Sequence, residues 1–407
     1  MSLSSLVLVL LLALPWVSPW APGPSTAAPS LLVAWACAGL FMLMRGAQAA
    51  SDRAAGLAGQ GDRPTLRPLG DLLAPAWLGA ALLSAWIGLL QYQGLAPQFA
   101  GWIHPTGLGE AFANLRQRNQ FATLTNIGLV ALIGYGLGRQ AGDLAAQTRS
   151  LGLRAAGAMA VVLLMAGSAA SSSRTGLLQL LLLLLLPLFW RSWRRPVVLQ
   201  GLGLALAAYG VAALLLPITL GLSPAEAGVL ARLQSGESGC ASRWVLWRNV
   251  LELVSLRPWA GWGWGELDYA HFVTPFAGPR FCAILDNAHN LPLHLAVELG
   301  VPVALLLCGG MAWAVWRARP WREVDPARQL AWGVLALILL HSLLEYPLWY
   351  GPFQVAAWMC IVLLLGGTPA ADRPWQGPLG LLSGLALLLT ASYGLWDYHR
   401  IRQIYLP

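Results

Sequence analysis

Two histidine clusters beside long apolar stretches could carry acid–base chemistry. In the first, Asp286 precedes His289 by three residues, and Asn290 follows it at the start of an apolar stretch. A histidine in such a place can titrate near neutral pH and act as an acid, a base or a hydrogen-bond donor. The alternative is a histidine that only satisfies local structure. We take His289 as a candidate catalytic residue and Asn290 as a candidate site-lining residue.

The second cluster contains His341 and Glu345, which would share one helix face because they are four residues apart. The pair is either an internal hydrogen bond, or Glu345 is a base that reaches the mouth of a cavity. Tyr346 and Tyr350 follow, one turn apart if the helix continues through Pro347. They could line the same site or belong to an aromatic belt at a membrane interface.

Arginines are the third group of residues that could bind a ligand or take part in a reaction. Arg174 stands in the run Ser171-Ser172-Ser173-Arg174-Thr175, between two apolar stretches with almost no loop, and Arg118 opens another apolar stretch. Charged groups at or inside a membrane are costly and point to function. The alternative is a side chain that snorkels to lipid headgroups. We expect Arg174 to bind a ligand.

Metal and cofactor chemistry find little support in the sequence. His289 and His294 are five residues apart and lack paired carboxylates, which does not match the spacing of metal ligands. The sequence also lacks the Gly-x-Ser-x-Gly turn of serine hydrolases and a Walker-type loop. We therefore predict no metal site and no cofactor.

The elements that must position these residues are membrane-spanning helices. Of 407 residues, 57% are hydrophobic and only 10% are charged, which excludes a water-soluble globular enzyme and a disordered chain. Apolar stretches of about 20 residues recur, each long enough to cross a bilayer as a helix. The sequence thus predicts an all-α polytopic integral membrane protein with about 11–12 transmembrane helices. The expected spans are 3–20, 29–44, 72–91, 120–138, 155–171, 176–190, 197–217, 290–316, 329–348, 352–367 and 377–395.

The arginine distribution gives the orientation. All 25 basic residues are arginine, and the loops after the second, fourth, sixth and eighth spans are rich in them, which marks those loops as cytoplasmic. The net charge of +8 is therefore mostly a topology signal, and we expect no nucleic-acid partner. Ten arginines on the opposite side need another reason, either a polyanionic ligand or pairing with loop carboxylates. They are Arg116, Arg118, Arg174, Arg232, Arg243, Arg248, Arg257, Arg280, Arg400 and Arg402.

One long extramembrane segment, 218–289, divides the chain into N-terminal helices (1–217), a large periplasmic loop, and C-terminal helices (290–407). A loop of this length is usually functional. We expect amphipathic helices in it, one starting at Ser223-Pro224 and one running from a Ser242 cap to about Leu256. Cys240 and Cys282 either form a disulfide, which an oxidising compartment permits, or remain two thiols.

The chain resembles the bacterial superfamily of O-antigen ligases, O-antigen polymerases and protein O-oligosaccharyltransferases, and most closely the oligosaccharyltransferase branch. The resemblance implies a GT-C-like membrane glycosyltransferase and covers roughly Arg116 to Tyr350. It rests on Arg118-Asn119-Gln120, Ser173-Arg174-Thr175-Gly176, Arg243 to Arg248 leading into Gly261-Trp262-Gly263, His289-Asn290 followed by Gly300-Val301-Pro302, and His341-Ser342 with Glu345 to Tyr350.

This resemblance implies en bloc transfer of a glycan from undecaprenyl diphosphate to an acceptor hydroxyl on the periplasmic face of the inner membrane. The implied acceptor is Ser or Thr of a pilin-like or periplasmic protein. Lipid A core, as in an O-antigen ligase, and a growing polysaccharide, as in a polymerase, remain alternatives. A lipid-linked glycan transporter is a further alternative, although we see no internal repeat and the polar groups gather at one face.

The resemblance also suggests roles for single residues. Arg118, Arg174, Arg243 and Arg248 would hold the donor diphosphate without a metal, although Arg248 could instead pair with Glu252. His289 would either activate the acceptor hydroxyl or hold donor phosphate as a cation. The oligosaccharyltransferase branch commonly continues into a soluble periplasmic domain, whereas this sequence stops just after its last span, which leaves the acceptor open.

Overall fold

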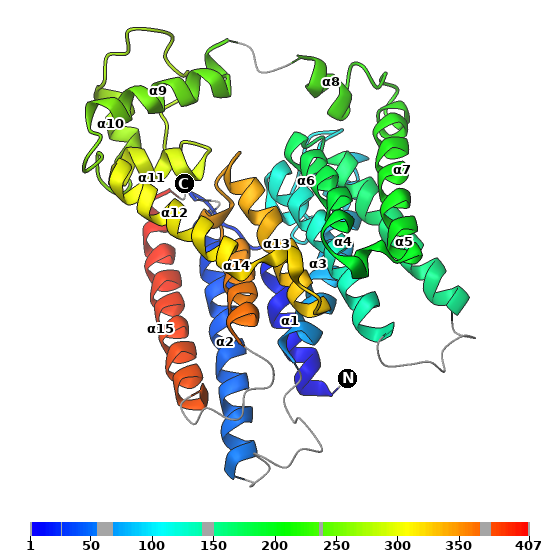
Figure 1. Ribbon diagram of the computed structural model, residues 1–407. Helices are drawn as coiled ribbons and strands as arrows, with labels where there is room; N and C mark the ends of the chain where they lie inside the picture. Colours follow the sequence, from blue (N-terminus) through cyan, green and yellow to red (C-terminus); the bar gives the residue numbers. More distant parts are fainter. Residues whose placement is uncertain are drawn as a thin grey trace.

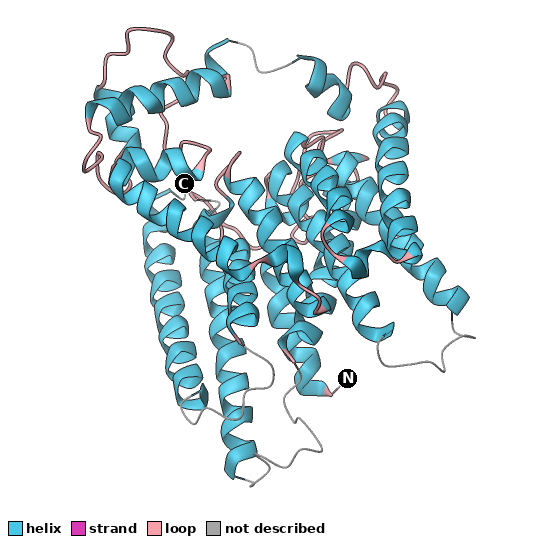
Figure 2. Cartoon of the chain, viewed as in Figure 1, coloured by secondary structure: helices cyan, strands magenta, loops and turns pink. Residues whose placement is uncertain are grey.

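The computed structural model describes residues 2–25, 27–54, 68–140, 150–235, 239–366 and 376–405. Within these ranges the chain forms α-helices and short 3₁₀ turns without any strand (Figure 2). The all-α prediction is therefore confirmed. The stretches 55–67, 141–149 and 367–375, which carry part of the arginine pattern, lie outside the described residues.

Seven helices are long and apolar enough to cross a membrane (Figure 1). Three shorter apolar helices accompany them, and α13 packs between α4 and α14. Each expected span contains at least one helix, so the polytopic membrane architecture is confirmed. The seven are α2 (Ala27–Ala54), α3 (Leu69–Tyr92), α4 (Arg118–Gln140), α5 (Ser150–Ala170), α7 (Pro196–Thr219), α12 (Val301–Ala318) and α15 (Gln376–Arg402). The others are α1 (Leu3–Val17), α6 (Arg174–Leu185), α13 (Pro326–Ser342) and α14 (Gly351–Leu365).

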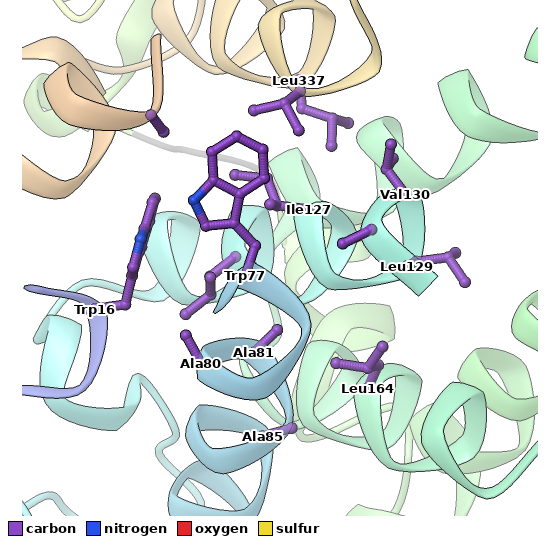
Figure 3. Close-up of a cluster of buried hydrophobic side chains, with 14 of the residues drawn as sticks. Trp16, Trp77, Ala80, Ala81, Ala85, Ile127, Leu129, Val130, Leu164 and Leu337 are labelled. Atoms are coloured by element: carbon purple, nitrogen blue, oxygen red, sulfur yellow. The ribbon is translucent and has the colours of Figure 1, made fainter. Parts of the chain in front are cut away.

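The main core lies where α1, α3, α4, α5 and α13 meet, around the fully buried Trp77 (Figure 3). Small residues bring the backbones close: a Cβ on Gly128 of α4 would overlap Ala81 of α3, and one on Gly167 of α5 would meet Ala85 at 2.8 Å. Close packing of this kind stabilises helix pairs in lipid, where burial of apolar surface gives little drive. The result is a tight frame around α4, the helix that begins at Arg118.

A second, smaller core lies in residues 246–297 and includes Leu246, Val250, Leu267 and Val297. It joins α9 (Arg243–Leu256), α10 (Leu267–Val273) and α11 (Leu291–Leu299), which stand at one end of the bundle in Figure 1. The cluster thus extends past residue 289 into the first helical turns of what the sequence indicated as a membrane span.

The local predictions for this segment have mixed outcomes. Ser242 accepts a hydrogen bond from the backbone N–H of Val245 and caps α9, which ends at Leu256 as expected. The helix expected at Ser223-Pro224 is wrong: this stretch is a turn, and α8 (Gly228–Ser235) begins four residues later. Cys240 and Cys282 form a disulfide with Cα atoms 5.3 Å apart.

The expected continuous span 290–316 is also wrong, because the chain breaks at Gly300 between α11 and α12. Gly300 has a φ of +86°, and a Cβ there would overlap the carbonyl of Trp259. The backbone N–H groups of Trp262 and Gly263 donate to the carbonyls of Val297 and Glu298, both at 2.9 Å. The Gly-Trp-Gly turn therefore satisfies carbonyl groups at the end of α11 and allows the helix to stop at Gly300.

Candidate active site

The site centres on the carboxylate of Glu345, whose side chain is only 6% exposed. Its Oε2 lies 2.7 Å from Nδ1 of His289. Its Oε1 accepts hydrogen bonds from Nδ2 of Asn119 at 3.0 Å and from the guanidinium of Arg243. Arg243 also donates to the carbonyl of Leu344. One carboxylate thus joins α4, the start of α9, the segment just before α11 and the turn after α13.

Glu345 stands outside a helix, which corrects the sequence prediction. The expected span 329–348 is too long, since α13 ends at Ser342 and a 3₁₀ turn occupies Pro347–Trp349. The backbone N–H of Glu345 still donates to the carbonyl of His341 at 2.8 Å, which adds one further helical turn. The helix does not continue through Pro347, yet the rings of Tyr346 and Tyr350 stack with centroids 6.0 Å apart.

His289 is held by its backbone as well as by Glu345. Its φ of +50° lies in the left-handed region, which costs free energy in a residue other than glycine and is frequent at functional sites. Its N–H donates to Oδ1 of Asn287 at 2.9 Å. Asn290 caps α11 by accepting from the N–H of Leu293 and donates to the carbonyl of Leu343 at 3.0 Å. The ring of Tyr346 stands edge-on to His289, 5.0 Å between centroids. The imidazole therefore has a fixed orientation.

The charge on Glu345 is strongly stabilised. Burial alone would raise its pKa, but the hydrogen bond from His289 and the positive charge of Arg243 outweigh burial and lower the pKa to about 2. Burial raises the pKa of both Tyr346 and Tyr350. At neutral pH the site thus contains an ionised carboxylate bounded by neutral phenols.

A second chain of contacts joins the site to α6. Oδ1 of Asn119 accepts from the hydroxyl of Ser173 at 2.6 Å. Ser173 is also the N-cap of α6, accepting from the N–H of Gly176 at 3.0 Å. Arg174 is the first residue of that helix and is partly buried. Asn119 therefore places the positive end of α6, with Arg174 on it, next to the Glu345 group.

Beneath these residues lies a buried polar layer. The hydroxyl of Thr123 lies 3.0 Å from Nδ1 of His341 and 3.1 Å from Oε1 of Gln179, and Nε2 of Gln179 donates to the carbonyl of Leu337. His341 is fully buried and contacts the edge of Phe353. This layer fixes α4, α6 and α13 to one another. His341 also lines the narrow gap beside Glu345 and Tyr346, so its site-lining role stays a prediction.

The predicted arginines divide into two groups. Arg243 contacts the carboxylate of Glu345 directly, and Arg174 begins α6 one residue after Ser173, which bonds Asn119. Arg118 instead forms an ion pair with Glu110 and lies at the rim. Arg248 is exposed and lies against Gly278, and no ion pair with Glu252 is present among the described residues. The structure does not bring Arg248 to Glu345.

Glu298 points toward His294 and forms a buried pair with it. Oε2 of Glu298 lies 3.4 Å from Nε2 of His294, and both side chains are at most 3% exposed. The ring of His294 meets Trp349 edge-on at 4.8 Å. Trp349 in turn stacks with Trp264 at 6.3 Å. This pair anchors α11 against the turn that carries Glu345.

Sequence reasoning did not select Asn119 and Ser173 as site residues, although both stand in the quoted motifs. One signal could have found them: Asn119, Thr123 and Asn126 recur at intervals of four and three along α4, a polar stripe on one face of an apolar helix. The described residues also contain no group of three metal-ligating side chains, and metal independence stays a prediction.

Comparisons with known proteins match three stretches of the chain, and together these stretches contain Glu345 and the residues that contact it. The family described as O-antigen ligase matches residues 159–308, which include Ser173, Arg243 and His289. The family described as virulence factor membrane-bound polymerase, C-terminal, matches 329–407, and that described as protein glycosylation ligase matches 111–135. A general O-oligosaccharyltransferase from Acinetobacter baylyi is 24% identical over 199 residues, which are 45% of this chain and 33% of that relative. Along these stretches the chain is therefore similar to the superfamily of O-antigen ligases and O-oligosaccharyltransferases.

Proposed function

We propose that this protein is a glycosyltransferase that moves a glycan from undecaprenyl diphosphate to the hydroxyl of Ser or Thr in an acceptor protein. The observation that carries the proposal is the His289–Glu345 pair, placed beside Arg243, Arg174 and the N-terminus of α6. A carboxylate, an imidazole and two arginines at one helix-bundle end suit an attacking hydroxyl and a diphosphate leaving group.

His289 would act as the general base. With Nδ1–H donating to Glu345, Nε2 of the imidazole is free of a proton and can accept one from the acceptor hydroxyl. The oxygen then attacks the anomeric carbon, a new C–O bond forms, and the bond from that carbon to the phosphate oxygen breaks. The electron pair leaves on the diphosphate, and His289 releases its proton to solvent. Glu345 would orient the ring and stabilise the imidazolium.

Arg174 and Arg243 would stabilise the leaving diphosphate. A guanidinium matches phosphate oxygens with two parallel donors and stays charged at any working pH. The N-terminus of α6 adds backbone N–H groups and the positive end of the helix dipole. These groups can neutralise the diphosphate without a metal ion, so we propose metal-independent transfer. Arg118 would contribute at the rim, where Glu110 already pairs with it.

We further propose that the site faces the periplasm in the bacterial inner membrane. The arginine-rich loops support this orientation, and the Cys240–Cys282 disulfide suits an oxidising compartment. On this proposal 1–217 and 290–407 form the membrane domain and 218–289 covers the site.

A second candidate, transfer to lipid A core, is favoured by the O-antigen ligase match over residues 159–308. The protein acceptor is favoured by the names of the relative and of the family matched around Asn119. The two share the same donor chemistry and differ only in what carries the attacking hydroxyl.

The test is a purified assay with a lipid-linked glycan and separate peptide and lipopolysaccharide-core acceptors, normalised to folded protein. His289→Ala should lose about 10²–10⁴ of turnover, as expected when a general base is removed. Arg174→Lys should fall about 10²-fold, because lysine lacks the planar fork. His399→Ala, an exposed histidine at the end of α15, and Arg248→Lys are the controls and should keep at least half of the activity. Near-normal turnover of both His289→Ala and Arg174→Lys would refute the proposal.

A further inference from the structure

A pair of stacked tryptophans lies beside the turn that carries Glu345. The rings of Trp264 and Trp349 are nearly parallel, with an angle of 14° between their planes and 6.3 Å between their centroids. Trp264 is nevertheless 64% exposed, so most of its ring stays accessible to a ligand. The pair differs in this respect from the buried tryptophans of the main core, such as Trp77.

Both rings are held in place by contacts with α11. Trp264 follows Gly263, whose backbone N–H donates to the carbonyl of Glu298 at 2.9 Å. Trp349 meets the ring of His294 edge-on, with 4.8 Å between centroids. The two tryptophans are thus positioned before any ligand arrives, and a surface of this kind binds at a lower entropy cost than one that must first become ordered.

The stack is built on the same two segments as the proposed base pair. Trp349 follows Glu345 by four residues, and their Cα atoms are at most about 14 Å apart, because that is the reach of four extended residues. His294, which contacts Trp349, follows His289 by five residues. A glycan of several sugars that has its first sugar at His289 can therefore extend to the stacked rings.

Two carboxylates accompany the exposed ring. A Cβ added to Gly263 would lie 3.1 Å from Cγ of Glu266, so the Glu266 side chain lies against the turn that carries Trp264. Glu266 precedes α10 without capping it, and Asp268 accepts one hydrogen bond, from the backbone N–H of Tyr269. Both carboxylates are exposed, and neither forms an ion pair within the described part of the chain. They can therefore accept hydrogen bonds from a ligand.

This combination of groups favours a saccharide as the ligand. A sugar ring presents C–H groups on its face, which pack on the negative face of an indole, and hydroxyl groups at its edge, which donate to carboxylates. A bilayer surface suits the ring less well, because anionic headgroups would be repelled by Glu266 and Asp268. The arginine nearest to Trp264 in the sequence, Arg257, lies over the ring of Trp262 at 4.1 Å.

We propose that Trp264, supported by Trp349 and bordered by Glu266, binds a sugar of the donor glycan beyond the sugar whose anomeric carbon reacts. The proposal rests on the function proposed above and deepens it, because it assigns a subsite that favours donors with longer glycans. No bond forms or breaks at this subsite. Trp264 is a binding residue and is separate from the groups that act on the acceptor hydroxyl and the diphosphate.

The first experiment compares two lipid-linked donors, one with a single sugar and one with an oligosaccharide. Trp264→Ala should raise the KM for the oligosaccharide donor about tenfold, the size of one aromatic stacking contact, and leave the KM for the single-sugar donor within about twofold. Trp264→Phe, which keeps a flat ring, should recover most of the loss. Trp259→Ala is the matched control and should behave as the wild type, since Trp259 is 80% exposed in the same segment.

Other outcomes of this comparison would overturn the proposal. An equal rise in KM for both donors would show that Trp264 contacts the lipid part of the donor or the bilayer. A rise in the KM of the acceptor alone would show that the acceptor binds there. An unchanged KM for the oligosaccharide donor would show that the ring makes no contact of importance.

The second experiment measures binding without turnover. The free oligosaccharide, without lipid or diphosphate, is titrated calorimetrically into the wild type, Trp264→Ala and Glu266→Gln in nanodiscs. Trp264→Ala should bind about tenfold more weakly than the wild type. Glu266→Gln should bind about threefold more weakly, because a neutral amide oxygen accepts a weaker hydrogen bond than a carboxylate. Equal behaviour of the wild type and Trp264→Ala, including no binding by either, would overturn the proposal.

The two proposals fail in different ways. If the wild type transfers neither donor, the proposed function fails, and the titration still decides whether Trp264 binds a saccharide. If the wild type transfers both donors and Trp264→Ala does so equally well, the glycosyltransferase function stands and the subsite is refuted.

Discussion

Replacement of Glu345 by glutamine tests the centre of the site, because it removes the charge and nearly preserves the shape. The pKa of Glu345 falls from its ordinary value of 4.5 to about 2 in the folded protein. At about 1.4 kcal/mol for each pKa unit, the native state stabilises the ionised carboxylate by about 3 kcal/mol. Glu345→Gln should lose stability on that order at pH 7, because the variant also removes the ion pair with the partly buried Arg243.

The pH dependence of this loss has a definite sign. Because the folded pKa lies below the unfolded one, the stabilisation is fully present above about pH 4.5 and disappears as the pH falls toward 2. The difference in free energy of unfolding between wild type and Glu345→Gln should therefore be constant from pH 5 to 8 and shrink below about pH 4.5. Chemical unfolding in nanodiscs, followed by tryptophan fluorescence, measures it.

Activity should fall more steeply than stability. Without the carboxylate, Nδ1 of His289 loses its fixed proton, and loss of such an orienting acid in a hydrolase triad costs about 10⁴ in turnover. Glu323→Gln is the matched control. Glu323 lies just before α13 and also pairs with an arginine, Arg328, at 2.8 Å. The variant should lose some stability and keep glycan transfer. If Glu345→Gln unfolds within 0.5 kcal/mol of the wild type and keeps half of its activity, the reasoning about this carboxylate is refuted.

Further predictions concern the frame, the segment above the site, its orientation and the leaving group. Gly300→Ala should sharply reduce the yield of folded protein, since the new Cβ would overlap the carbonyl of Trp259. Gly310→Ala in α12 is the control, because its Cβ meets nothing within 4 Å, and it should fold normally. Detergent gel filtration compares the two variants, and equal yields would contradict the close contact at Gly300. Replacement of Cys240 and Cys282 by serine should destabilise the segment 218–289 by about 4 kcal/mol, because the disulfide, with a sequence separation of 42, restricts the unfolded chain. Limited proteolysis of 218–289 should accelerate, and an unchanged rate would count against this prediction. A cysteine at the exposed Tyr269 should react with a membrane-impermeant maleimide in intact spheroplasts, and reaction only after permeabilisation would invert the topology. Turnover should survive a chelator; a loss restored by magnesium or manganese would refute metal-independent transfer.

Structural features that depend on local composition could be predicted from the sequence. Apolar length predicted the long helices of the bundle, and the apolar stretch that follows Asn290 placed His289, the candidate base, at a helix start. The position of Arg248 could not be predicted from the sequence. It lies five residues after Arg243 on α9, so the two side chains leave the helix on different faces. Only the packing of α9 against α10 and α11 shows which face meets Glu345. The break at Gly300 depends on a turn some 40 residues earlier, and a hydropathy pattern cannot report a partner that far away.

The carboxylate shared by distant segments has a consequence for biosynthesis. Asn119, Arg243 and His289 emerge from the ribosome well before Glu345, and none of them has its contact with this carboxylate until the turn after α13 has been made. A partly inserted chain therefore has arginines near the bilayer surface but no oriented base. On the proposed chemistry, donor lipid that meets such a chain is not consumed, and the enzyme becomes competent only when insertion is nearly complete.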